Sequence, residues 1–272
     1  MTNPEYLLPE LLAPLVRNTI FSGNIHHIVQ ADSTNSVALR GAVLAGQHPD
    51  ETPEGAVFLA EEQTAGRGRS THTWHSERGT GIYCSFLLRP PMAPSDALWL
   101  SLIAGVAVQD AVRETTGLAA DIRWPNDLLI DGRKFCGILT EMHAEPDRIH
   151  HAVIGIGMNV NQAKMPSDLA DIGTSLRIET HRIHSRFELL IRLLRSFDRY
   201  YNQFLADGAT PILRRFAEVS TYFKGKRVRI TTAGESFTGT TAGLEPSGVL
   251  RVTRDDGRGV VPVLSGDIAE AS

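Results

Sequence analysis

The segment Val57–Leu88 decides the fold of this part of the chain, because two apolar stretches enclose a long polar connection. The stretches VFLA at 57–60 and GIYCSFLL at 81–88 have the length and apolar character of buried strands. Between them, GRGRS at 66–70 lies in a loop that extends from 63 to 80. Loops of this length in compact domains are usually functional. We therefore expect a binding loop between two strands.

The GRGRS run favours an anionic ligand. Arg67 and Arg69 stay protonated at physiological pH and offer forked donors that match carboxylate or phosphate. Gly66 and Gly68 allow the backbone to approach a ligand closely. The expected ligand therefore carries phosphate, carboxylate or both. Short Arg/Gly runs also occur in disordered, RNA-binding and merely solvated loops, so this run alone leaves those alternatives open.

Length and charge limit the class of protein. The 272 residues suffice for one large domain or for a large and a small one. A net charge of −4 with 21% charged residues shows no global basic excess, which disfavours DNA binding as the main task. Only about twenty residues precede the first expected strand, fewer than a helix-turn-helix domain needs. We therefore expect no DNA partner and no N-terminal DNA-binding domain.

Cysteine content and hydropathy bear on location. Cys84 and Cys136 lie in apolar segments and define neither a disulfide framework nor a tetrahedral zinc site. His72 and His75 with Glu77 share one flexible loop, which is a poor frame for metal ligands, so no metal site is expected. No apolar run approaches roughly 18 residues, and no secretory leader is apparent. We expect a cytoplasmic protein without a membrane partner.

The hydrophobic patterns predict a mixed α and β domain followed by a small β-barrel. The predicted helices are 4–17, 32–45, 95–116, 185–206 and 212–219. The predicted strands of the first domain are 25–30, 57–60, 81–88, 122–124, 128–130, 136–142 and 152–160. Four short alternating segments with glycine-containing turns follow, at 228–232, 237–244, 249–253 and 260–264. We place the domains at 1–222 and 223–272.

Two further motifs place polar groups at strand ends. In RWPND at 123–127, proline ends a strand and Asn126 and Asp127 follow at its tip. DGRKFCG at 131–137 predicts a hairpin whose outgoing strand begins near Lys134. A plain strand end with an Asx turn and a solvated hairpin lysine are the alternatives. GIGMNVN at 155–161 lacks the third glycine of a dinucleotide fingerprint, and no Walker pattern is present.

Taken in order, these motifs resemble those of the biotin–protein ligases, of the monofunctional kind without a DNA-binding domain. The resemblance covers nearly the whole chain and rests on DSTN at 32–35, EEQTAGRGR at 61–69, Trp74, RWPND at 123–127, Arg133-Lys134 with Gly137, and Gly157-Met158-Asn159. It implies an α+β fold in which helices flank a mixed β-sheet. That fold is related to class II aminoacyl-tRNA synthetases and carries a C-terminal SH3-like barrel.

The resemblance implies a biotin–acetyl-CoA-carboxylase ligase. In this family the carboxylate of biotin attacks the α-phosphate of ATP, which gives biotinyl-5′-AMP and pyrophosphate. A lysine of a biotin carboxyl carrier protein then takes the biotinyl group and AMP leaves. The expected cofactors are ATP and Mg²⁺, and the expected partner is the carrier domain of acetyl-CoA carboxylase. Edge-to-edge pairing of sheets would allow a homodimer, although no motif fixes it.

The resemblance also implies roles for individual residues. Lys134, Arg67 and Arg69 are the expected catalytic residues, since they hold the carboxylate and phosphates together as charge builds. The expected biotin-binding residues are Ser33, Thr34, Asn35, Gln63, Gly66, Arg67, Gly68, Arg69, Lys134 and Gly137. The expected nucleotide-binding residues are Arg67, Arg69, Trp74, Asn126, Asp127, Lys134 and Asn159. The carboxylate near the nucleotide either helps to bind Mg²⁺ or deprotonates the incoming lysine.

The chain departs from the family pattern at two positions. Arg123 stands where a lysine is common, which keeps the charge and changes its geometry, and His72 stands near a common arginine, which would make a loop contact depend on pH. Two alternatives remain. A lipoate or octanoyl transferase shares the fold, but the Arg-Arg and Gly-rich signature of lipoate ligases is missing. A biotin sensor without chemistry is disfavoured by the intact Lys134, Arg67 and Arg69.

Overall fold

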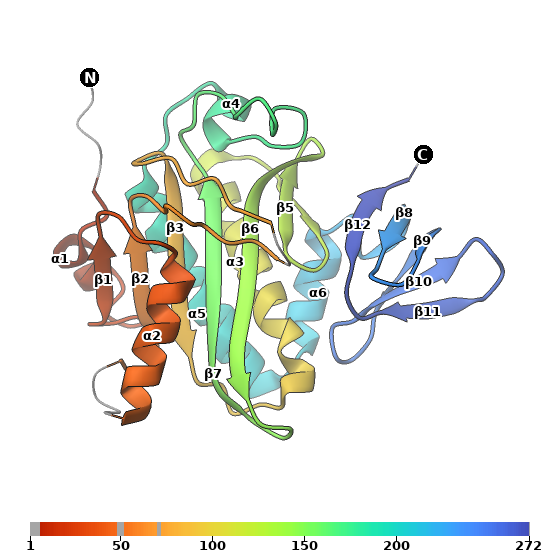
Figure 1. The fold of residues 1–272 in the computed structure, drawn as a ribbon, viewed down its shortest axis with the longest axis horizontal. Coiled ribbons are helices and arrows are strands. Elements are labelled where there is room, and N and C mark those ends of the chain that lie inside the picture. The colour runs from red at the N-terminus through yellow and green to blue at the C-terminus, as the bar shows by residue number, and fades with distance from the viewer. Residues whose placement is uncertain (1–5, 48–51, 70–71, 272) are drawn as a thin grey trace.

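The computed structural model describes residues 6–47, 52–69 and 72–271. Ser70 of the GRGRS run, and the first two residues of the predicted 4–17 helix, lie outside the described residues. The described chain forms one large and one small β-sheet, with helices packed on the large one (Figure 1). The predicted mixed sheet flanked by helices is confirmed.

The large sheet combines parallel and antiparallel pairing. Its strands are β1 (Ile25–Ile28), β2 (Ala56–Ala60), β3 (Gly81–Leu88), β4 (Asp121–Arg123), β5 (Asp127–Ile130), β6 (Arg133–Ala144) and β7 (Ile149–Asn159). They lie in the order β1-β2-β3-β7-β6-β5-β4, in which β1 and β2 are parallel and every other pair is antiparallel. β2 and β3 are neighbours, so both ends of the 61–80 loop emerge from adjacent strands.

Helices cover both faces of the large sheet. In Figure 1, α2 (Thr34–Gln47) crosses the front, and α3 (Leu98–Thr116), α5 (Arg186–Asp207) and α6 (Thr210–Val219) lie behind it. Every residue of α3 from Trp99 to Val112 is buried, because α3 packs against the sheet and against α5. The segment Pro94–Thr116 is long and apolar enough to cross a membrane, but most of it is buried inside the protein, as in a core helix. The short α4 (Leu176–Thr180) was not predicted.

The predicted N-terminal helix is wrong in extent and in its buried face. The chain forms only α1 (Pro9–Leu12) and a 3-10 turn, η1 (Ala13–Leu15), because a proline near the start of each restricts helix extension. Leu12 is fully buried, whereas Leu11 is 53% and Leu15 is 41% exposed. The single apolar stripe expected along residues 4–17 is therefore split.

The C-terminal segment forms an open sheet. Its strands are β8 (Lys224–Thr231), β9 (Ser236–Leu244), β10 (Leu250–Arg254), β11 (Val260–Val263) and β12 (Asp267–Glu270). They lie in the order β11-β10-β9-β8-β12, all antiparallel, and no pairing joins β11 to β12 within the described residues. The predicted barrel is therefore not closed. β12 was missed because its four residues contain one large apolar side chain, Ile268, too few for a visible alternation.

Candidate ligand-binding and active site

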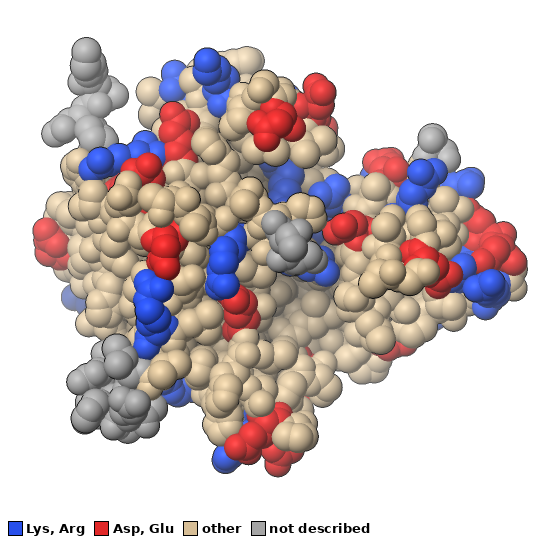
Figure 2. Space-filling model, in the orientation of Figure 1, with Lys and Arg blue, Asp and Glu red and all other residues tan. Residues whose placement is uncertain are grey.

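Two adjoining cavities lie beside the 61–80 loop. The large cavity, of about 450 Å³, is bounded by that loop, the β4–β5 turn, the 165–173 segment and residues of β8 and β12. The small cavity, of about 40 Å³, lies between the N-terminus of α2 and the middle of β6 and β7. Gly68, Arg69, Trp74, Asn126 and Lys134 line both. In Figure 2, Lys and Arg side chains gather around the hollow between the main body and the C-terminal sheet.

Polar side chains that satisfy one another form one wall of the small cavity. Ser33, Thr34 and Asn35 are each about 3% exposed at the start of α2. The Thr34 backbone N–H donates to Gln63 Oε1 at 2.8 Å, and Gln63 Nε2 donates to Ser76 Oγ at 2.8 Å. The wall therefore presents both donors and acceptors close together.

The β3 strand and the turn before α2 hold this wall in place. Ser85 Oγ, on β3, lies 2.6 Å from Asn35 Oδ1 and 2.7 Å from Thr34 Oγ1. Asp32 Oδ1 accepts the Ser33 N–H at 2.8 Å, and an ion pair with Arg40 fixes the same carboxylate. Hydrogen bonding from Arg40 lowers the pKa of Asp32 to about 2, so Asp32 is charged at neutral pH.

Trp74 lines the small cavity and lies against its floor. Its indole lies on the two facing glycines Gly137 of β6 and Gly157 of β7, which pair directly in the sheet. A Cβ at Gly157 would lie 2.5 Å from the indole, so no side chain fits there while the ring is in place. Trp74 Nε1 is buried and has no hydrogen-bond partner among the described residues. A buried unpaired donor costs free energy, which favours displacement of the ring by a ligand.

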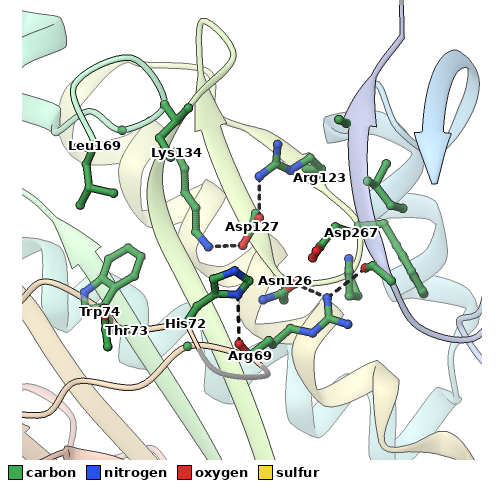
Figure 3. Close-up of a pocket in the computed structure, with 18 of the residues that line it drawn as sticks. Arg69, His72, Thr73, Trp74, Arg123, Asn126, Asp127, Lys134, Leu169 and Asp267 are labelled. Carbon is green, nitrogen blue, oxygen red and sulfur yellow. Dashed lines mark hydrogen bonds and ion pairs between the residues drawn. The ribbon is translucent and has the colours of Figure 1, made fainter. Parts of the chain in front are cut away.

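Lys134 faces the carboxylate of Asp127, which it meets at the boundary of the two cavities. Lys134 Nζ lies 2.5 Å from Asp127 Oδ1, and Arg123 Nη2 lies 2.7 Å from Asp127 Oδ2 (Figure 3). The register of β5 and β6 shifts between Leu128 and Leu129, an irregularity of the kind that re-aims side chains next to active sites. Lys134 therefore points to the two cavities and is not the solvated hairpin lysine of the alternative interpretation.

Asp127 is charged because its two cationic neighbours outweigh its burial. Burial alone would raise the pKa of the carboxyl group, but the charges of Lys134 and Arg123 hold it below its usual range. The carboxylate is therefore neutralised on both oxygens. An anionic ligand that recruits Lys134 would have to share it with Asp127 or take it over.

Arg69 connects the loop to two other parts of the site. Its Nη1 donates to Asn126 Oδ1 at 3.1 Å and lies 3.5 Å from the carbonyl oxygen of Gly266, just before β12 (Figure 3). Asn126 Nδ2 in turn donates to Ile138 O at 2.9 Å, which fixes the amide. His72 Nδ1 lies 3.2 Å from the carbonyl oxygen of Arg69, at an exposed edge of the large cavity.

Arg67 has a partner that sequence reasoning missed. Its guanidinium forms an ion pair with Glu141 of β6, and Asn35 Nδ2 donates to the same carboxylate oxygen, Oε2, at 2.8 Å. Alternation along β6 was the available signal, because Gly137, Leu139 and Glu141 project from the same face. One carboxylate thus joins the loop to the polar wall of the small cavity.

The structure brings most of the predicted site residues together. Those on the small cavity are Ser33, Thr34, Asn35, Gln63, Arg67, Gly68, Arg69, Trp74, Asn126, Lys134 and Gly137. Asp127 and Asn159 line the large cavity, although Asn159 Nδ2 already donates to Thr174 O at 3.0 Å. Gly66 lies beneath Trp74, where its carbonyl accepts the Trp74 N–H and a Cβ would meet Trp74 O at 2.4 Å. The ligands of these residues stay predictions.

Further lining residues come from distant parts of the chain that motif reasoning did not reach. The small cavity also includes Gly155, and the large cavity includes Arg229 of β8 and Asp267 of β12. Within residues 6–47, 52–69 and 72–271, no group of three or more His, Cys, Asp or Glu side chains is arranged to hold a metal ion. Of the two described carboxylates that line the large cavity, Asp127 is engaged by two cations and Asp267 lies on β12.

Comparison with protein families gives two matches. Residues 28–159 match the Biotin/lipoate A/B protein ligase family, and residues 223–269 match the Biotin protein ligase C terminal domain. The first match spans α2, the 61–80 loop and all the motifs through Asn159. The second coincides with the small C-terminal sheet.

Individual relatives extend these matches over nearly the whole chain. The bifunctional ligase/repressor BirA of Bacillus subtilis is 37% identical over 244 residues, which cover 89% of this chain and 73% of that protein. The biotin–acetyl-CoA-carboxylase ligase of Mycobacterium tuberculosis is 32% identical over 278 residues, 98% of each chain. A biotin protein ligase from Aquifex aeolicus, solved with biotin and ATP, superposes with a TM-score of 0.77 at 27% identity and covers 91% of this chain and 98% of its own. By sequence and by fold, this chain belongs to the biotin protein ligase family.

Proposed function

We propose that this protein joins biotin to ATP to give biotinyl-5′-AMP and pyrophosphate, and then transfers the biotinyl group to a lysine of a biotin carboxyl carrier protein with release of AMP. The observation that carries the proposal is Lys134 at the boundary between a small polar cavity and a large cavity that also holds Arg69 and Arg123. Both substrates of the first step are anions, and cations between them lower their repulsion. The Aquifex aeolicus relative was solved with these two ligands.

Biotin is assigned to the small cavity. Its ureido ring both donates and accepts hydrogen bonds, as the wall formed by Thr34, Asn35 and Gln63 does. The cavity of about 40 Å³ is too small for a bicyclic ligand, so Trp74 leaves the surface of Gly137 and Gly157 when biotin binds. Once displaced, the indole can cover the nucleotide and exclude water from the acyl phosphate.

ATP is assigned to the large cavity, and Lys134 holds the two reacting groups together. As the biotin carboxylate attacks the α-phosphate, negative charge moves onto the phosphate oxygens and the departing pyrophosphate. Lys134 Nζ and the guanidinium of Arg69 are placed to stabilise that charge, with Arg67 available to the carboxylate when it leaves Glu141. Asp127 fixes the position of Lys134 before the substrates arrive.

Mg²⁺ would be held mainly by the phosphate oxygens of ATP. Such sites usually add only one or two protein carboxylates. The residues around Asp127 fit this arrangement, because Asp127 is already paired with Lys134 and Arg123. Bound there, the ion would neutralise phosphate charge and improve pyrophosphate as a leaving group.

The partner and its setting complete the proposal. The acceptor is the carrier domain of acetyl-CoA carboxylase, since relatives of similar length are named for it. Free, buried thiols at Cys84 and Cys136 support a reducing cytoplasm. From Thr140 to Ala144, β6 pairs with β7 along one edge, and no other described strand takes its second edge, which supports a homodimer formed by strand pairing there. Light scattering at increasing concentration tests the dimer.

Pyrophosphate release by the purified protein tests the reaction. With MgATP we expect release with biotin and not with lipoate or octanoate, and transfer of labelled biotin to an added carrier domain. Release with lipoate or octanoate alone would assign the site to the other branch of the family. Biotin binding without any release would make the protein a sensor.

A further inference from the structure

Two buried tryptophans hold one turn of the C-terminal sheet against the main body. Trp99 Nε1, on α3, donates to Pro246 O at 3.0 Å, and Trp124 Nε1 donates to Gly248 O at 2.9 Å. Both side chains are at most 2% exposed. The turn between β9 and β10 is closed by its own hydrogen bond from Gly248 N to Glu245 O at 2.9 Å.

The two tryptophans differ in what lies beside them along the chain. Trp99 is followed by core residues of α3. Trp124 is followed, after Pro125, by Asn126 and Asp127, which contact Arg69 and Lys134. A displacement of the Trp124 backbone therefore reaches, within three residues, the partners of Arg69 and Lys134, two of the cations that line the large cavity.

The strand before Trp124 is fixed from the same side. Ser220 Oγ donates to Ile122 O at 2.6 Å, and the Thr221 N–H donates to Asp121 Oδ1 at 2.8 Å. Both donors lie in the short connection that leads into β8. The segment 121–127 is thus held at its beginning by the entry to the C-terminal sheet and at Trp124 by the β9–β10 turn.

We propose that Trp124 is a positioning residue, whose hydrogen bond to Gly248 transmits the docking of the C-terminal sheet to Asn126 and Asp127 and so sets where Arg69 and Lys134 point in the large cavity. The proposal rests on the assignment of ATP to that cavity. Because α2, β3 and β6 hold the polar wall of the small cavity, that wall keeps its contacts with biotin, and the effect falls on the large cavity and on the boundary that Arg69 and Lys134 form.

A pair of matched tryptophan variants tests this role. Trp124→Phe and Trp99→Phe each keep an aromatic ring, and each removes one hydrogen bond from an indole N–H to the β9–β10 turn. We expect Trp124→Phe to raise the KM for ATP and lower kcat, for a loss in kcat/KM of about tenfold or more, because small displacements of reacting groups are costly. The Kd for biotin stays within about twofold. Both variants lower Tm by similar amounts, but Trp99→Phe leaves the KM for ATP, kcat and the Kd for biotin unchanged.

A second pair of variants tests the Trp124–Gly248 contact by changing the β9–β10 turn. Gly248 has φ +84°, and a Cβ there would lie 3.3 Å from Trp99 and from Leu102, so Gly248→Ala lifts the turn without altering the cavity. Gly257→Ala on the β10–β11 turn is the control, with φ +81° and open space around it. We expect the loss in kcat/KM for ATP only in Gly248→Ala.

Hydrogen exchange separates this inference from the proposed reaction, because it needs no substrate. Amides of 126–138 should exchange faster in Trp124→Phe and Gly248→Ala than in their controls. Equal exchange in all four variants, equal kinetic losses in Trp99→Phe, or a biotin Kd that rises as much as the KM for ATP would each overturn the role of Trp124. A wild-type protein that releases no pyrophosphate would instead refute the proposed function and leave the exchange result standing.

Discussion

The small and the large cavity share a boundary of five residues but differ in how they are prepared for a ligand. In the small cavity the polar groups are paired with one another, Arg67 is paired with Glu141, and the indole of Trp74 occupies the space over two glycines. The large cavity is open at about 450 Å³ and carries cations from the 61–80 loop, β4, β6 and β8. Ligand binding in the small cavity thus requires Trp74 to move and Arg67 to leave Glu141, whereas the large cavity already has space for its ligand and exchanges only the ion pairs of Lys134 and Arg123 with Asp127.

This difference predicts whether a substitution changes ligand affinity or the rate of the chemical step. A ligand that replaces internal contacts gains only the difference between the new contacts and the old ones, so changes in the small cavity should alter affinity modestly and in either direction. Cations around the open cavity act where charge develops, so their removal should lower the rate of the chemical step. The expected effects below descend in size.

Lys134→Ala should have the largest effect. Removal of a charged donor from the place where charge develops costs about 10²–10³-fold in the chemical step. We expect adenylate formation to fall by at least that factor, while the Kd for biotin changes by less than about tenfold. Lys226→Ala, which removes a lysine paired with Glu270 in the C-terminal sheet, is the control. A rate loss matched by an equal loss of biotin affinity would contradict the proposal that Lys134 acts mainly on the chemical step.

Gly157→Ala should act on biotin alone. The added Cβ would stand 2.5 Å from the present indole position, in the space that the ligand must take over. We expect calorimetry to show biotin affinity reduced about tenfold or more, with ATP affinity unchanged, since one overpacked methyl group costs about 1–3 kcal/mol. Gly105→Ala on α3, where a Cβ makes only ordinary contacts, should leave both affinities unaltered. Equal loss of ATP affinity in Gly157→Ala contradicts the assignment.

Glu141→Gln should strengthen biotin binding. The ion pair with Arg67 is partly exposed, and such pairs contribute about 0.2–1 kcal/mol, so release of Arg67 to the substrate carboxylate is worth up to about fivefold. Glutamine can still accept the hydrogen bond from Asn35. Biotinol, which lacks the carboxylate, should bind with unchanged affinity, and Glu145→Gln on the β6–β7 turn should alter neither ligand. An equal gain for biotinol would show that charge exchange at Arg67 is not the cause.

The smallest effect concerns the pH dependence of stability. The pKa of Asp127 is lower in the folded protein than in the unfolded chain, so its ion pairs stabilise the fold fully above the ordinary Asp pKa of about 4 and lose that contribution as pH falls through the depressed value. The Tm difference between wild type and Asp127→Asn should be constant from about pH 5 to pH 8 and shrink in more acidic solution. A difference that shrinks as pH rises from 5 would contradict the sign of the shift.

The motifs that are local in sequence were predictable, and the contacts between distant segments were not. β2, β3 and the loop between them follow from two apolar runs, and the strand end at Asn126 follows from Pro125. The prediction of one N-terminal helix was wrong because it rested on leucine spacing alone, whereas Pro9 and Pro14 divide the segment into two short turns of helix. The pairing of Arg67 with Glu141 and the approach of Gly266 to Arg69 depend on tertiary packing, which spacing along a chain does not encode.

The position of Trp74 shows the same limit within one site. The family resemblance predicted that Trp74 binds the nucleotide, but the observed position of its ring depends on two glycines that meet only through the pairing of β6 with β7. The open C-terminal sheet is a further case, because whether β11 meets β12 depends on the twist and length of five short strands and not on their alternation.

Displacement of Trp74 by biotin is the central claim, and fluorine NMR of the protein labelled with 5-fluorotryptophan measures it directly. The chain has three tryptophans, so three resonances can be assigned by single substitution to phenylalanine. Saturating biotin should shift the Trp74 resonance and leave those of Trp99 and Trp124 in place, and MgATP alone should not reproduce the shift. A Trp74 resonance unchanged by bound biotin, or moved as far by MgATP alone, would contradict the account.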